Sequence, residues 1–194
     1  NGKLTGDNTD VAGIEAPLRA WLAEHNAPPF SSALILGAGG AARAACLALR
    51  ELGIPDIAVA NRTPGKAKCV ARELCVRAIP WEERAANAEQ DNQPWQLIVN
   101  TTPLGMLGQY EKLSPLPADE LPQALTGVRL VFDLVYNPIR TRLVTEAEAA
   151  GCAILSGVSM FLHQGLAQFT IWTGKELDAN RARQVLMADM LCTG

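Results

Sequence analysis

The sequence predicts an α/β fold, namely a Rossmann-like doubly wound parallel sheet with flanking helices and two further helices at the carboxyl terminus. Short apolar runs alternate with helical patterns along the chain, which is typical of a parallel sheet covered by helices. A glycine-rich run, Gly37-Ala38-Gly39-Gly40-Ala41-Ala42, joins the first apolar run to an Ala-rich helical pattern. Polar clusters follow two later apolar runs, where sheets of this kind bind their ligands.

The composition suits a globular domain without a strongly charged partner. The 194 residues are 48% hydrophobic and carry a formal net charge of -3, with no block of like charges. We therefore expect a sizeable core, and neither nucleic acid nor a membrane surface as a partner. Five cysteines without a C-x-x-C pair and two histidines predict no metal site. No apolar run reaches the roughly 18 residues of a membrane span and no leader pattern occurs, so a cytoplasmic location is expected.

The first element is an amphipathic helix that links the amino terminus to the sheet. Its apolar residues recur at helical spacing, at Val11, Ile14, Leu18, Trp21 and Leu22. Asn8, Thr9 and Asp10 are its candidate N-caps. The chain starts at Asn1 within a motif, so we expect a fragment of a longer protein. Three parts are predicted within a single domain: a linking helix (1–30), a Rossmann-like core (31–156) and carboxyl-terminal helices (157–194).

The glycine-rich run predicts a dinucleotide site. Gly37 permits a tight turn, Gly39 lets the backbone approach a pyrophosphate, and Ala42 lets the helix pack on the strand. The first N–H groups of the helix lack internal partners, so they add an anion site. A strand over 33–36, a helix over 43–49 and a strand over 57–60 complete a βαβ unit. An ordinary Gly-rich turn is the alternative.

The end of the second strand predicts NADP rather than NAD. In NAD-binding units this position holds an acid for the ribose 2′-OH, whereas an Arg suits a 2′-phosphate. Here Asn61-Arg62-Thr63 provides an Arg and no acid, and Lys66 and Lys68 open the next helix. The alternative is that Arg62 is a solvated turn residue.

The remaining elements follow from the same patterns. Apolar runs predict four more strands, over residues 76–79, 95–99, 128–135 and 152–155. Helical patterns predict helices over 81–88, 141–150, 159–173 and 178–191, with a loop and a short helix over 108–127. Two polar clusters end the fourth and fifth strands, namely residues 100–106 and Tyr136-Asn137-Pro138. They are expected at a ligand crevice, or they are turns closed by side-chain hydrogen bonds.

Together these motifs resemble the shikimate dehydrogenase family. The resemblance rests on separated motifs in the right order: Asn8-Thr9-Asp10, the Gly37 to Ala42 loop, Asn61-Arg62-Thr63, residues 100–106, Asp133 with Tyr136-Asn137-Pro138, and Gly157 with Met160 and Gln164. It implies an NADP-linked oxidoreductase of aromatic amino-acid biosynthesis that reduces the ketone of 3-dehydroshikimate to shikimate.

The resemblance also implies roles for individual residues. The Asp matching Asp10 pairs in the family with a Lys from an amino-terminal substrate domain, which this sequence lacks. Because Asp10 alone cannot donate a proton at pH 7 without a strongly raised pKa, its expected role is to orient the substrate. Tyr136 and Gln164 are implied to contact substrate too. The implied cofactor contacts are Gly37, Ala38, Gly39, Gly40, Ala41, Asn61, Arg62, Thr63, Lys66, Asn100, Thr101, Thr102, Pro103, Met106, Val135, Gly157 and Met160.

Three functions remain consistent with the sequence. The first is the cofactor-binding part of an NADP-dependent shikimate dehydrogenase, expected to be inactive alone. The others are an enzyme of the quinate/shikimate type and a regulatory module that binds NADP without chemistry. Asp10, Tyr136 and Gln164 favour an enzyme, because a binding module has no use for substrate-side polar groups. Apolar residues of the last helices predict self-association or a contact with the missing domain: Leu162, Leu166, Phe169, Ile171, Trp172, Leu186 and Met190.

Overall fold

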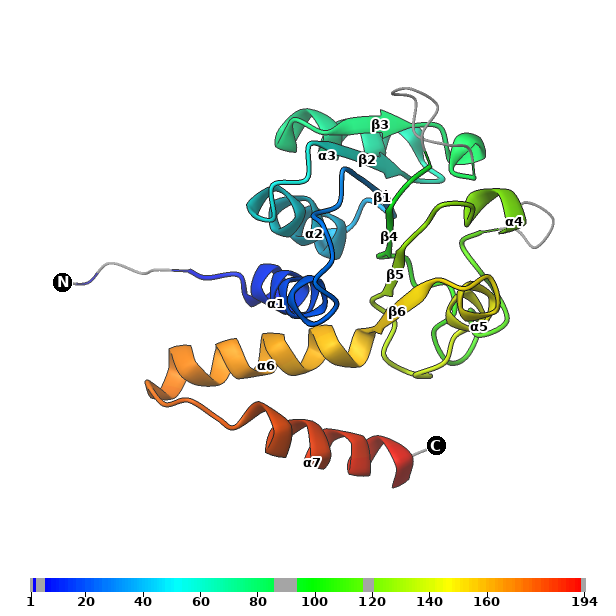
Figure 1. Cartoon of the computed structure of the whole chain (residues 1–194). Coiled ribbons are helices and arrows are strands. Elements are labelled where there is room, and N and C mark those ends of the chain that lie inside the picture. The colour runs from blue at the N-terminus through cyan, green and yellow to red at the C-terminus, as the bar shows by residue number, and fades with distance from the viewer. Residues whose placement is uncertain (1, 3–5, 86–93, 117–120, 193–194) are drawn as a thin grey trace.

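The protein folds around a parallel sheet of six strands in the order β3-β2-β1-β4-β5-β6 (Figure 1). The computed structural model describes residues 2, 6–85, 94–116 and 121–192. The strands are β1 (Ser32–Leu36), β2 (Asp56–Ala60), β3 (Arg77–Ile79), β4 (Leu97–Asn100), β5 (Leu130–Asp133) and β6 (Ala153–Ser156). This order reverses between β1 and β4, so the predicted doubly wound sheet is confirmed.

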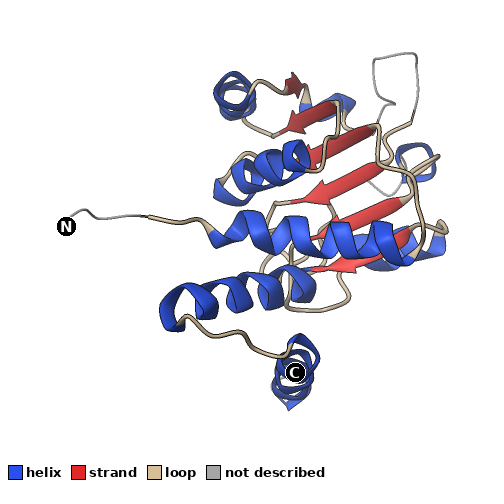
Figure 2. Ribbon diagram, turned by 60° about the vertical axis from the view of Figure 1, so that its left-hand side comes forward, coloured by secondary structure: helices blue, strands red, loops and turns tan. Residues whose placement is uncertain are grey.

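Helices cover both faces of the sheet (Figure 2). One face carries α1 (Thr9–Glu24), α2 (Gly40–Glu51) and α3 (Pro64–Leu74). The other carries α4 (Leu121–Ala124) and α5 (Arg142–Ala149), together with the 3₁₀ turn η1 (Trp81–Glu83). The two expected carboxyl-terminal helices are α6 (Gly157–Thr173), which packs against α1, and α7 (Ala179–Cys192), which lies beyond α6 and away from the sheet.

Two apolar cores lie on opposite faces of the sheet, and the alternation of side chains along β1 separates them. Ala33 and Ile35 pack with residues of α1, α2 and α3, whereas Leu34 and Leu36 pack with residues of α4 and α5. Every residue of β1 and β2 is buried, because a parallel sheet covered on both faces leaves none exposed. This explains why residues 33–36 and 57–60 are continuous small or apolar runs in the sequence.

The structure corrects several predicted boundaries. The fifth strand spans 130–133 rather than 128–135, because the Asp133 side chain accepts a hydrogen bond from the Val135 N–H (3.1 Å) and turns the chain. The last strand leads directly into α6, which starts at Gly157 rather than 159. Of the helix predicted over 81–88, residues 81–83 form the 3₁₀ turn, and 86–88 lie outside the described residues. Among the three candidate caps of α1, Asn8 accepts the Asp10 N–H.

Within the described part of the chain, no helix has both the length and the apolar character needed to cross a membrane.

Candidate functional site

The turn from β1 into α2 passes directly over the end of β4. The Gly37 N–H donates to Ala60 O (2.8 Å), and the Thr101 N–H and hydroxyl both donate to Leu36 O (2.8 Å each). Gly37 has a φ of +111°, and a Cβ at this residue would lie 2.5 Å from Thr101 Oγ1. Both the backbone conformation and the close approach therefore require glycine at this position.

The start of α2 is exposed at the carboxyl ends of the strands. Gly39 is the N-cap, without a side-chain hydrogen bond, and the first turn contains no acidic residue. A Cβ at Gly39 or Gly40 would meet no atom within 4 Å. The unpaired N–H groups and the positive end of the helix dipole therefore form a site for an anionic group.

A small cavity of about 170 Å³ lies beside this helix start. Its lining comes from the glycine loop, the end of β2, the 3₁₀ turn and the loop after β4: Gly37, Ala38, Gly39, Asn61, Arg62, Trp81, Thr101, Thr102, Pro103 and Leu104. Asn61 Nδ2 donates to Thr63 O (3.1 Å) and thereby holds the turn after β2. The exposed Arg62 makes no hydrogen bond or ion pair within the described ranges, so its guanidinium is available to a ligand.

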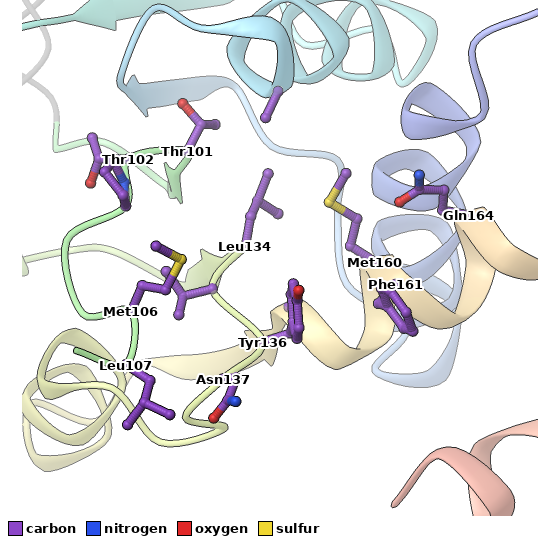
Figure 3. Close-up of a pocket in the computed structure, with 14 residues that line it drawn as sticks. Thr101, Thr102, Met106, Leu107, Leu134, Tyr136, Asn137, Met160, Phe161 and Gln164 are labelled. Carbon is purple, nitrogen blue, oxygen red and sulfur yellow. The ribbon is translucent and has the colours of Figure 1, made fainter. Parts of the chain in front are cut away.

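A larger cavity of about 620 Å³ lies between the ends of β4 and β5 and the start of α6 (Figure 3). It is lined by Ala41, Thr101, Thr102, Pro103, Met106, Leu107, Leu134, Val135, Tyr136, Asn137, Gly157, Met160, Phe161 and Gln164. No charged side chain of the described residues is among them. Thr101, Thr102 and Pro103 line both cavities, so the two are neighbouring parts of one crevice.

A buried polar pair supports the floor of this crevice. Asn100 and Asp133 are both fully buried and face each other as the last register pair of β4 and β5. Asp133 accepts hydrogen bonds from Asn100 Nδ2 (2.9 Å), the Val135 N–H (3.1 Å) and the Thr141 hydroxyl (2.6 Å). Burial raises the pKa of Asp133, and these three hydrogen bonds oppose the rise.

Most of the predicted cofactor and substrate residues come together at the crevice. Five do not line either cavity: Asp10, Gly40, Thr63, Lys66 and Asn100. The Asn100 side chain is fully buried and hydrogen-bonded to Asp133 and Thr102, so the predicted cofactor contact of Asn100 stays a prediction. Asp10 lies in the first turn of α1, Gly40 starts α2, Thr63 caps α3, and Lys66 is exposed on α3.

Six lining residues were not predicted as individual ligand contacts: Trp81, Leu104, Leu107, Leu134, Asn137 and Phe161. Asn137 and Leu104 belong to the polar clusters after β5 and β4, so their position in the chain was a usable signal. Phe161 had no such signal. It lies at the cavity because its ring stacks on Tyr136, with the centroids 5.2 Å apart.

The position of α6 at the crevice depends on two glycines. A Cβ at Gly157 would lie 2.4 Å from Leu134 O, and one at Gly13 of α1 would lie 2.9 Å from Met160 O. Glycine at these contacts lets α6 approach the loop after β5 and lets α1 approach α6. This close packing brings Met160 and Gln164, which lie one turn apart, to the cavity.

We expect Gly157→Ala to lower the free energy of unfolding by about 1–3 kcal/mol, because the methyl group must displace backbone atoms. Denaturant titration monitored by circular dichroism measures this loss. Gly165→Ala, on the same helix, is the matched control: a Cβ there meets no atom within 4 Å, and alanine favours a helix by roughly 0.5–1 kcal/mol over glycine. Equal stability of the two variants would contradict the close contact at Gly157.

Comparison with known proteins identifies the family. The family profile "Shikimate / quinate 5-dehydrogenase" matches residues 22–91, and "Shikimate 5'-dehydrogenase C-terminal domain" matches residues 157–187. The shikimate dehydrogenase (NADP(+)) of Maridesulfovibrio salexigens is 42% identical over 185 residues, which are 95% of this chain and 62% of the relative. The chain belongs to the shikimate dehydrogenase family.

Solved members of the shikimate dehydrogenase family share the fold. The Thermus thermophilus enzyme, in complex with NADP(H) and shikimate, aligns with a TM-score of 0.74 and 36% identity over 94% of this chain and 63% of its own. The quinate dehydrogenase of Corynebacterium glutamicum, in complex with NAD, aligns with a TM-score of 0.77 and 27% identity over 95% of this chain and 63% of its own. The chain thus spans less than two thirds of these family members.

Proposed function

We propose that the chain is the NADP-binding part of a shikimate dehydrogenase that reduces 3-dehydroshikimate to shikimate, and that it binds cofactor but has negligible activity alone. The observation that carries the proposal is the continuous crevice from the open start of α2, through Thr101 to Pro103, to the cavity beside α6. The crevice combines the N–H anion site at the start of α2, the Arg62 guanidinium and the apolar large cavity. The phosphates and the nicotinamide ring of one dinucleotide require these three features.

The residues present fit NADP on grounds of charge and shape. The N–H groups at Gly39 and Gly40 would hold the pyrophosphate, and Arg62 would bind the 2′-phosphate. The cavity walls at Met106, Val135 and Met160 would exclude water from the nicotinamide ring. When bound, NADPH supplies a hydride to a carbonyl carbon.

The described residues provide only part of what the reaction needs. The oxygen of the ketone gains negative charge and must receive a proton, yet the large cavity is lined only by neutral groups. Tyr136 and Gln164 would bind the substrate by hydrogen bonds. We propose that Asp10, in the first turn of α1, acts together with a Lys in the part of the relatives that this chain does not span.

The quinate-type alternative draws support from the likeness to the Corynebacterium enzyme, whose structure contains NAD. The turn after β2 favours NADP instead, because Asn61 and Arg62 stand where an acid would bind the ribose 2′-OH. The cofactor preference of the chain therefore separates the NAD-dependent alternative from the main proposal, whereas acceptance of quinate needs its own assay.

NADP should bind more tightly than NAD, and Arg62→Ala should remove most of the difference. A charge-assisted contact contributes about 1.5–3 kcal/mol, so the variant should bind NADP roughly 10- to 150-fold more weakly and NAD almost unchanged. Calorimetric titration of both cofactors measures this. Arg72→Ala, in the last turn of α3 and away from both cavities, is the control. Equal weakening of both cofactors by Arg62→Ala would exclude recognition of the 2′-phosphate by Arg62.

The isolated chain should also self-associate through α6 and α7. Ile171, Trp172, Leu177 and Val185 are 53%, 77%, 48% and 66% exposed, whereas Leu162, Leu166, Phe169 and Leu186 are half-buried. Clustered exposed apolar side chains favour a partner. Sedimentation velocity should show a dimer or larger species that Trp172→Glu shifts toward the monomer. A monomer across the full concentration range would contradict this interface.

A further inference from the structure

The pair Asn100–Asp133 joins the two strands whose loops form the walls of the large cavity. Each residue is the last of its strand, and the two are register partners on adjacent strands. Asn100 Nδ2 donates to Asp133 Oδ1 (2.9 Å), and the Leu134 N–H donates to Asn100 O (3.0 Å). The ends of β4 and β5 are thus connected by side chains as well as by backbone.

Hydrogen bonds extend from this pair into both walls. Asn100 Oδ1 accepts from the Thr102 N–H (3.0 Å) and hydroxyl (2.7 Å), and Asp133 Oδ1 accepts from the Val135 N–H (3.1 Å). Thr102 and Val135 both line the cavity. On the far side, Asp133 Oδ2 accepts from the Thr141 hydroxyl, which also caps α5. The position of each wall is therefore set by the same two buried side chains.

Stability alone does not account for a carboxyl group at this place. Burial raises the pKa of Asp133, so folding has a desolvation cost for its charged form. Buried ionic and polar groups are often replaceable by apolar residues of similar volume without loss of stability. The carboxylate oxygens of Asp133 do something that apolar side chains cannot do, since they hold three donors in fixed directions: Asn100 at the end of β4, Val135 in the loop after β5 and Thr141 at the N-cap of α5.

We propose that Asp133 is a positioning residue which, through Asn100, holds the loops after β4 and β5 at the separation that accepts the cofactor. This inference rests on the proposed function, because its effect is read as affinity for NADP. Asp133 does not line the cavity, so it acts through Thr102 and Val135 rather than by contact.

The test compares NADP affinities of variants by calorimetric titration. Asp133→Ala removes the acceptor of the Val135 N–H, Asn100→Ala removes the acceptor of Thr102, and each variant breaks the Asn100–Asp133 link between the two walls. Each should therefore weaken NADP binding roughly 10- to 100-fold, as small misplacements of binding groups do. The double variant should be no weaker than the weaker single variant, because both changes break one network. Asp133→Asn should bind within roughly threefold of the wild type, since Oδ1 remains an acceptor and Nδ2 can donate to Thr141 Oγ1.

A matched control separates positioning from loss of stability. Ile57 is buried at the start of β2, at the other end of that strand from Asn61 and Arg62, and it lines neither cavity of the crevice. Ile57→Ala should lower the midpoint of denaturant unfolding, because it leaves a cavity in the core. Its NADP affinity should stay within roughly threefold of the wild type under conditions where circular dichroism shows a folded protein. Equal weakening by Ile57→Ala and Asp133→Ala would overturn the inference.

Other outcomes are equally decisive. Wild-type affinity in Asp133→Ala, or multiplied losses in the double variant, would overturn the positioning role while the proposed function stands. If Asp133→Ala does not fold, the NADP affinities of Asn100→Ala and Asp133→Asn test the inference instead. A folded Asp133→Asn that fails to bind NADP would overturn the inference. Failure of the wild type to bind NADP would overturn the proposed function and the inference with it.

Discussion

Gly39→Val is expected to abolish NADP binding while the free energy of unfolding stays nearly the same. The backbone at Gly39 (φ -91°, ψ -162°) is extended and accessible to valine, and a Cβ there meets no atom within 4 Å. The fold therefore tolerates the side chain. Its methyl groups would occupy the space in front of the first N–H groups of α2. Loss of two charge-assisted hydrogen bonds, at about 1.5–3 kcal/mol each, weakens binding at least roughly 100-fold.

Titration calorimetry measures the binding, and circular dichroism with denaturant measures the fold. Gly165→Val is the control, because Gly165 is also exposed and unobstructed but lies on α6 outside both cavities. It should bind NADP like the wild type. The positive φ of this loop occurs at Gly37 and not at Gly39. The expected effect of Gly39→Val is therefore steric and does not come from backbone strain. Normal NADP binding by Gly39→Val would mean that the glycine loop is an ordinary turn.

The second large effect concerns turnover. With NADPH and 3-dehydroshikimate, the chain alone should show no measurable reduction although it binds the cofactor. Positioning of reactants contributes about 7–11 kcal/mol to catalysis, and general acid–base help contributes a further 10²- to 10⁴-fold. Among the described residues, no charged side chain lines the large cavity.

Steady-state assays of NADPH oxidation measure this turnover, first with the chain alone and then after adding, as a separate polypeptide, the part of the Maridesulfovibrio salexigens relative that this chain does not span. Recovery of activity in the mixture would support the proposed division of the site. Asp10→Asn in the same mixture tests the role assigned to Asp10, and it should lower kcat more than NADP affinity. Substantial turnover by the chain alone would show that no group outside it is required.

The sequence predicted the fold well because both faces of the sheet are covered. Residues 33–36 of β1 form a continuous apolar run, and the glycine-rich run marks the turn into α2. The buried hydrogen-bonded position of the Asn100 side chain could not be predicted, for a physical reason. A polar residue at the end of a parallel strand resembles a ligand contact, and its partner Asp133 is 33 residues away in the chain. Only the register of β4 and β5 brings the two together.

The contribution of α6 was predictable only in part. Met160 and Gln164 were placed by family resemblance, and their spacing put them on one helix face. The stacking of Phe161 on Tyr136 could not be predicted, because it depends on how closely α6 approaches the loop after β5. That approach follows from the absence of a side chain at Gly157, a feature whose consequence appears only in three dimensions.

The reversal of strand order between β1 and β4 also indicates where two related chains could be joined to make a chimera. The glycine loop follows β1, in the half of the sheet formed by β3, β2 and β1. Asn100 and Asp133 lie in the other half, at the ends of β4 and β5. A crossover between β3 and β4 would therefore transfer each arrangement intact from one parent to a chimera. The contact to check across that boundary is Gly37 against Thr101, because a Cβ at Gly37 would lie 2.5 Å from Thr101 Oγ1. Between parents that share this pair, a chimera is expected to exchange Arg62, the proposed determinant of cofactor preference, while it keeps the cavity residues that follow β4 and β5.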